Sequence, residues 1–165
     1  MTLDNRLQEL AVDRVTAERP VSYEDIPQWV TSEFASRMRL HSRALRGLKN
    51  AEYEDIGLVC DLLELLALSY VDSKRGVPNA WQSFEEGLTS HGVDLSKSIS
   101  ETRAGQHGEE YFVRNRNQNE FLEWHLKKGA SRNPKNSLRI YFFWDEEDAE
   151  VIVGYLPGHL DNRMT

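Results

Sequence analysis

The chain has 165 residues, of which 39% are hydrophobic and 28% charged, a composition typical of a globular protein rather than a disordered or membrane-embedded one. This length is that of about one domain with a hydrophobic core of its own. The net charge of −7 argues against a general nucleic-acid binder. The one cysteine, Cys60, excludes an intramolecular disulfide framework and the usual cysteine-based zinc sites.

The sequence shows no sign of a targeting or membrane-spanning segment. Residues 1–19 mix charged and apolar side chains, unlike the apolar region of a signal peptide. The longest apolar stretch, residues 62–71, is interrupted by Glu64 and is far shorter than the ~20 residues that a membrane span needs. We therefore expect a cytoplasmic protein with no membrane partner.

Apolar residues recur at helical spacing through the first ninety or so residues. They predict helices over residues 3–15, 28–49, 53–74 and 79–90. The helix over 53–74 is apolar on most sides, which is typical of a central helix in a bundle. Its polar strip carries the acidic residues Glu54, Asp61, Glu64 and Asp72. In the helix over 79–90, Trp81 is expected to point inward together with Phe84 and Leu88.

After about residue 108 the hydrophobic period falls towards two, which is typical of β-strands. Strands are expected over residues 110–114, 138–144 and 150–156, and the last two are expected to form a hairpin. Residues 121–127 fit a helix or a strand. Residues 94–108 are rich in serine, glycine and charge, which indicates a linker or a long loop.

Helices followed by strands predict an α+β fold, with an N-terminal helical bundle packed on a C-terminal antiparallel β-sheet of three to four strands. The expected regions are 1–92 (helical), 93–108 (linker or long loop) and 109–165 (β-sheet), together forming one compact domain. Alternation along 138–144 places Arg139 and Tyr141 on one face of the sheet. We expect that face to be the more accessible one.

Basic residues are concentrated in one part of this acidic chain. Residues 103–144 hold eight basic and four acidic side chains. A basic surface with aromatic side chains among its cations suits a phosphate backbone and its bases. The alternative is that these lysines and arginines only solvate a sheet.

Three pieces of sequence carry a resemblance to a known family: His125-Leu126-Lys127-Lys128, the strand LRIYFF from Leu138, and the strand VIVGY leading to His159. Residues 121–160 are similar to the C-terminal half of small bacterial toxins of the RelE/ParE superfamily. The similarity covers about 40 of the 165 residues. It implies RNA binding, often on the ribosome, and metal-independent cleavage in which the 2′-hydroxyl attacks the phosphodiester. That step needs a base, a cation and an acid.

The resemblance implies a candidate site on the sheet. Its expected catalytic residues are His125, Arg139, Tyr141 and His159, and its expected RNA-binding residues are Lys127, Lys128, Arg132 and Lys135. Histidine titrates near neutral pH, and lysine and arginine neutralise phosphate charge. Each role has a structural alternative: a rim position for His125, a turn cap for His159, and an ion pair with Glu110 or Glu123 for Arg139.

Other patterns give little support to other chemistry. No nucleotide-cofactor, hydrolase or zinc-peptidase motif occurs, and the five histidines lack metal-ligand spacing, so we expect no cofactor and no metal. The acidic run 145–148 is expected to be a solvated turn. The competing function is a non-catalytic acidic interaction protein of the antitoxin, immunity or sequestering type. Its contact surface would be the acidic strip of helix 53–74 and the run 145–148.

Overall fold

The computed structural model describes residues 18–100, 102–103 and 110–160. The helices are η1 (Tyr23–Asp25), α2 (Ile26–Glu33), α3 (Ser42–Lys49), α4 (Ile56–Leu65), the π-helical turn η2 (Leu66–Tyr70), α5 (Val71–Lys74) and α6 (Ala80–Ser90). The strands are β1 (Met38–Leu40), β2 (Asp94–Lys97), β3 (Phe112–Asn115), β4 (Gln118–Phe121), β5 (Trp124–Lys128), β6 (Leu138–Asp145) and β7 (Glu150–Tyr155). The expected helix 3–15 lies outside the described residues.

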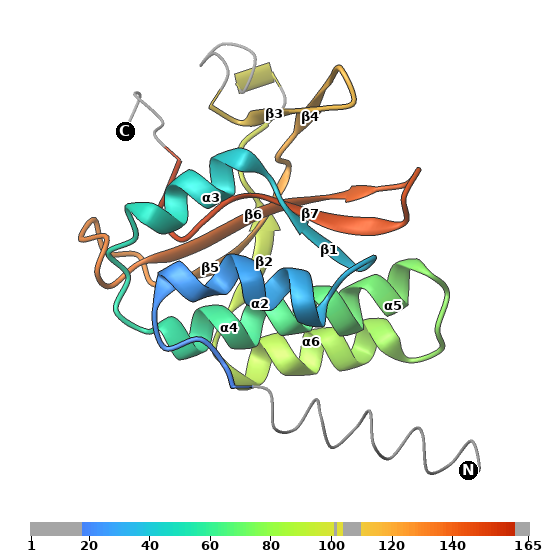
Figure 1. Ribbon diagram of the computed structural model, residues 1–165, viewed down its shortest axis with the longest axis horizontal. Coiled ribbons are helices and arrows are strands. Elements are labelled where there is room, and N and C mark those ends of the chain that lie inside the picture. Colours follow the sequence, from blue (N-terminus) through green and yellow to red (C-terminus); the bar gives the residue numbers. More distant parts are fainter. Residues whose placement is uncertain (1–17, 101, 104–109, 161–165) are drawn as a thin grey trace.

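The main sheet has five strands in the order β1-β7-β6-β5-β2 (Figure 1). Strand β1 runs parallel to β7, whereas the other neighbours are antiparallel, so the sheet is mixed and five-stranded. The expected antiparallel sheet of three to four strands is wrong in these two respects, because β1 and β2 join it from the regions expected to be helical and linker. Strands β3 and β4 form a separate two-stranded sheet. The α+β class is confirmed, and so is the expected hairpin of β6 and β7.

The continuous helix expected over residues 28–49 is wrong. Helix α2 stops at Glu33, Ser36 takes a positive φ of 66°, and the chain enters β1 before α3 begins. Strand β1 has only three residues, too few to interrupt a helical pattern visibly. It exists because Met38 and its neighbours pair with β7, more than a hundred residues away.

The linker expected over residues 94–108 is wrong at its start, because Asp94–Lys97 is the edge strand β2, paired with β5. Only Leu95 of this strand packs against the apolar core, so its sequence shows no alternating pattern. Residues 104–108 lie outside the described part of the chain. The ambiguous segment 121–127 resolves into the end of β4 and most of β5.

One face of the main sheet carries the larger core. The side chains of Leu126, Ile140, Phe142, Val151 and Val153 pack there with apolar residues of the helices. Helix α4, η2 and α5 follow one another without a break and supply many fully buried side chains, as expected for a central helix. The expectation that Trp81 points inward is wrong. Trp81 is 44% exposed, while Phe84 and Leu88 of the same helix are buried.

The opposite face of the sheet is also covered. Tyr141, Phe143 and Ile152 pack there against Tyr111, Val113, Leu122 and Leu160, which come from outside the two central strands. The expectation that Arg139 and Tyr141 lie on an accessible face is therefore wrong. Their exposed fractions are 6% and 1%.

Helix α3 packs very closely against the end of β7. A Cβ atom at Gly47 would collide with the carbonyl oxygen of Leu156, and this backbone atom cannot give way as a side chain can. The close approach fixes the end of α3 next to the segment that follows β7. Within the described residues, no helix has the length and apolarity needed to cross a membrane.

Candidate functional site

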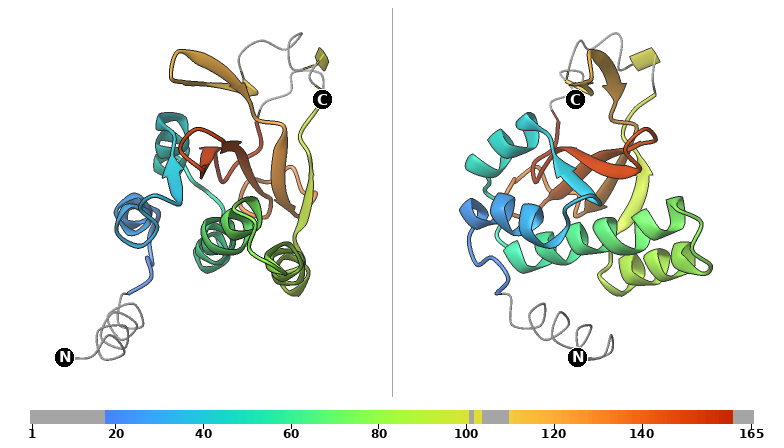
Figure 2. Two further views of the ribbon diagram at one scale, coloured as in Figure 1. Left: turned by 90° about the vertical axis from the view of Figure 1, so that its right-hand side faces the viewer. Right: turned by 45° about the vertical axis from the view of Figure 1, so that its right-hand side comes forward.

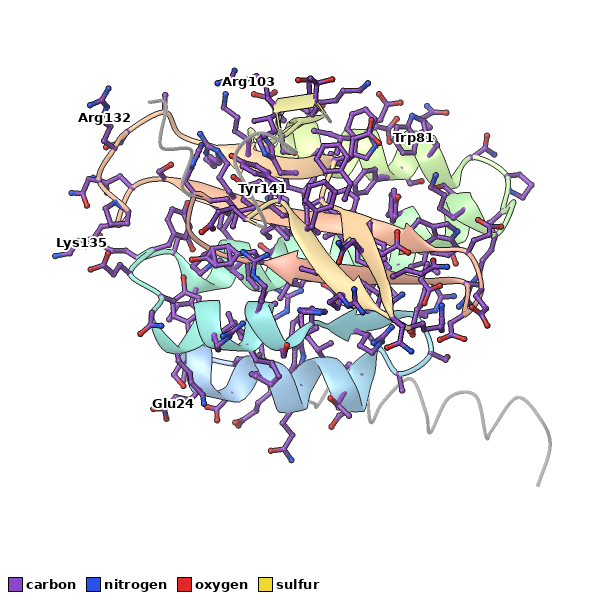
Figure 3. All side chains as sticks on the ribbon, turned by 90° about the horizontal axis from the view of Figure 1, so that it is seen from above. Glu24, Trp81, Arg103, Arg132, Lys135 and Tyr141 are labelled. Carbon is purple, nitrogen blue, oxygen red and sulfur yellow. The ribbon has the colours of Figure 1, made fainter. Side chains whose placement is uncertain are left out.

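A pocket of about 690 Å³ opens where three segments meet: the end of α3, the loop between β5 and β6, and the residues after β7. Its walls include Tyr53, Ser131, Arg132, Ser137, Arg139, Tyr155 and His159. Figure 3 shows Arg132 and Lys135 projecting from the β5–β6 loop at one end of the molecule. The pocket therefore brings together three of the residues that the sequence singled out, namely Arg132, Arg139 and His159.

Arg139 is the most unusual side chain of the pocket. Its Nη1 donates to the backbone carbonyls of Gly129, at 2.9 Å, and Leu138, at 2.8 Å. Its Nε is buried and has no hydrogen-bond partner. Burial lowers the pKa of the guanidinium, because desolvation disfavours the charged form. Main-chain carbonyls thus hold the Arg139 side chain at the pocket wall.

The expected ion pair of Arg139 with Glu110 or Glu123 is absent. Glu110 lies 3.7 Å from Arg43, and Glu123 lies 3.4 Å from Lys97. Over residues 18–100, 102–103 and 110–160, no carboxylate comes within ion-pair distance of the Arg139 guanidinium. The carbonyl of Gly129 reaches Arg139 from a tight loop start, where φ is 83° and a Cβ would meet the Asn136 carbonyl oxygen.

His125 is buried and does not line the pocket. Its Nε2 lies 3.0 Å from the Ser96 hydroxyl, its ring meets Tyr141 edge-on, and its Nδ1 has no partner. Burial, reinforced by the charges of Arg139, His159 and Lys127, lowers the pKa of His125 to about 4. The imidazole is therefore neutral at physiological pH, and the alternative of a rim position is wrong.

Tyr141 is also buried, and its hydroxyl accepts a hydrogen bond from the backbone N–H of Leu160 at 3.1 Å. Burial raises the pKa of this phenol well above its usual value. His159, in contrast, is exposed on the pocket wall. Its Nδ1 lies 2.6 Å from the Leu160 carbonyl oxygen, which can only accept, so Nδ1 carries the hydrogen and Nε2 stays available.

The four expected RNA-binding residues divide into two pairs. Arg132 and Lys135 are exposed on the β5–β6 loop, and Arg132 lines the pocket. Lys128 donates to the His91 carbonyl at 2.7 Å, which ties it to the end of α6. Lys127 is half-buried on β5 opposite Arg139 and lies outside the pocket wall.

Sequence reasoning missed Tyr155, which ends β7 and lines the pocket. The Arg43 guanidinium lies over its ring, 5.9 Å from the centroid. Its one sequence signal is its position just before the Leu-Pro-Gly turn that precedes His159. Ser131 and Ser137 add hydroxyl groups to the same wall and were missed because serine is common in any loop.

The acidic groups proposed as a protein-contact surface are largely neutralised within the chain. Asp61 and Glu64 both bind Arg19, and Asp72 lies 2.9 Å from Arg37. The strip on α4 and α5 therefore offers much less free negative charge than its sequence indicates.

The acidic run 145–148 is not simply a solvated turn. Asp145 is 4% exposed, and both its carboxylate oxygens accept from Arg116, at 2.9 and 2.7 Å. The same guanidinium binds Glu147 and Asp148. Attraction to Arg116 lowers the pKa of Asp145. This cluster is thus already occupied by a cation of the chain itself.

Comparison with family models, curated proteins and solved structures finds no match to this chain. The similarity to RelE/ParE toxins stays a prediction that depends on residues 121–160 alone.

Proposed function

We propose that the pocket over Arg139 binds a phosphate group of RNA. The observation that carries this proposal is the buried Arg139 guanidinium on the pocket wall, with no carboxylate within ion-pair distance in the described ranges. Glu52 lines the same pocket. An uncompensated buried charge is costly. A phosphate in the pocket would supply the opposite charge, in the charge-assisted geometry that arginine favours.

The surroundings of Arg139 favour a nucleotide over a bare anion. The volume of about 690 Å³ lies within the range of small-ligand sites. Tyr155 places a half-buried aromatic ring at the wall, with Arg43 over it, and the exposed Arg132 lines the same wall. A cation for the phosphate and an aromatic surface for the base are what single-stranded nucleic acid requires.

The geometry supports binding more strongly than cleavage. Transfer to a 2′-hydroxyl needs both a base and an acid at the scissile phosphate. Of the two histidines, only His159 lines the pocket, whereas His125 is buried against Ser96. The catalytic roles of His125, Arg139, Tyr141 and His159 stay predictions. The acidic interaction function is less favoured, because Arg19, Arg37 and Arg116 already bind the carboxylates it needs.

Replacing Arg139 is expected to weaken RNA binding strongly. We expect Arg139→Gln to lower the affinity for a fluorescent single-stranded RNA about 10–100-fold, the range of one hydrogen-bonded charge contact. The loss should be similar for unrelated sequences, since phosphate contacts carry no base information. The measurement is fluorescence anisotropy, repeated at several salt concentrations, where wild-type affinity should fall steeply.

Two further variants keep this test decisive. Arg132→Gln changes an exposed pocket residue that cannot endanger folding, and we expect it to weaken binding severalfold. Arg103→Gln changes an exposed arginine outside the pocket wall and should leave affinity unchanged. Wild-type affinity for RNA in Arg139→Gln and Arg132→Gln alike would contradict the proposal.

A further inference from the structure

The β3–β4 hairpin presents a face that the proposed pocket does not use. Cross-strand partners in an antiparallel pair share one face, and the register pairs Phe112 with Phe121 and Arg114 with Asn119. The two phenyl rings lie 5.5 Å apart and are only partly buried. Arg114 and Asn119 beside them are exposed. The hairpin thus carries an aromatic pair flanked by a cation and an amide.

The opposite face of the hairpin anchors it to the protein. Val113 is 2% exposed and belongs to the second core with Tyr141. Asn115 is 7% exposed and accepts a hydrogen bond from Arg39. Because alternate side chains point to opposite faces, Val113 and Asn115 hold the hairpin from one side. On the other side Arg114 and Asn119 are exposed, whereas Phe112 and Phe121 are half-buried and also pack against the second core.

The edge of β3 joins the hairpin to α3. The Phe112 carbonyl accepts from Arg43 at 2.8 Å, and the Arg114 carbonyl lies 2.9 Å from His41 Nε2. His41 is the N-cap of α3, and Arg43 lies in its first turn. Figure 2 shows the hairpin standing beyond the main sheet on the side of α3. The hairpin is therefore held in a fixed position relative to this helix.

Helix α3 leads from the hairpin to the pocket. Arg43, Arg46, Gly47 and Asn50 lie on one side of the helix, since residues three and four apart are neighbours. Gly47 and Asn50 line the pocket, and Arg43 covers the ring of Tyr155. Arg46, exposed between them, offers another cation. In Figure 3, α3 lies between the loop that carries Arg132 and the hairpin.

We propose that a single-stranded RNA runs from the Arg139 pocket along α3 and stacks its bases on the Phe112 and Phe121 face of the hairpin. This inference rests on the proposed phosphate site and names the ligand as a strand of several nucleotides. A groove with cations along the backbone and aromatic rings for successive bases is a common way to hold single strands. Paired bases in a duplex are unavailable for such stacking, so the surface selects single strands.

The test compares a 12-nucleotide single-stranded RNA with uridine monophosphate, which fills the pocket alone. Phe112→Leu keeps an apolar side chain but loses the aromatic face, and it should weaken binding of the 12-mer about tenfold. Arg114→Gln should weaken it severalfold, with a shallower salt dependence. Neither change should alter the affinity for uridine monophosphate, measured by calorimetry.

Trp81→Leu is the matched control, because Trp81 is an exposed aromatic residue far from Arg132 (Figure 3). It should leave both affinities unchanged. If Phe112→Leu and Arg114→Gln bind the 12-mer as the wild type does while Arg139→Gln binds it weakly, the proposed path along the hairpin is wrong. The proposed phosphate site in the pocket would then still hold. Equal binding of a duplex RNA would also overturn it. Wild-type binding of both ligands by Arg139→Gln would instead overturn the proposed function.

Discussion

Lowering the pH from 7 to 4 should reduce the free energy of unfolding by about 3 kcal/mol through His125 alone. Burial lowers the pKa of this imidazole to about 4 in the folded protein, against about 6.5 in an unfolded chain. Between these values the unfolded state binds more protons, so stability falls as pH falls. The contribution is fully present above pH 6.5 and is lost as the pH approaches 4.

Urea unfolding at pH 7 and pH 4 measures this effect. Other groups also titrate in this range, so the comparison is with His125→Gln, which keeps a polar partner for Ser96 but does not titrate. The variant should lose about 3 kcal/mol less than the wild type over the same interval. Identical losses in both proteins would mean that His125 is not held neutral by its surroundings, which include Arg139, His159 and Lys127.

Leu63→Ala should lower the free energy of unfolding by about 2–5 kcal/mol. Leu63 is fully buried in α4 and belongs to the larger core. Truncating a buried leucine removes the free energy gained by burying its side chain, and it leaves a cavity that the neighbouring side chains fill only in part. Denaturant unfolding at neutral pH measures the loss.

Leu68→Ala is the matched control for this prediction, because Leu68 lies in the same helical run but is only partly buried. Its loss should be smaller than that of Leu63→Ala. A loss below about 1 kcal/mol in Leu63→Ala would show that this side of α4 is not in the core.

The sequence predicted the helices and strands that have a clear apolar pattern of their own. The helical run from α4 to α5 and the β6–β7 hairpin have long, strongly periodic apolar patterns, and both are present. Strands β1 and β2 could not be predicted in this way. They have three and four residues, and they form because β7 and β5 offer them hydrogen-bonding edges.

The candidate site was predictable in composition but not in burial. Alternation correctly placed Arg139 and Tyr141 on one face of β6, yet nothing local indicated that Tyr111, Val113, Leu122 and Leu160 would cover that face. This covering buries His125 and Tyr141 and leaves Arg132, Arg139 and His159 on the pocket wall. Tyr155 joins them only because α3 packs against the end of β7.

If the pocket binds RNA as proposed, the Arg139 guanidinium on its wall contacts a phosphate. The most direct measurement is the ¹⁵N-detected Nε–H resonance of Arg139, assigned by its loss in Arg139→Gln and followed while uridine monophosphate is added. We expect a shift that saturates with the ligand, as the guanidinium forms a new contact with a phosphate. An Arg139 resonance that stays unchanged while RNA or uridine monophosphate binds would contradict it.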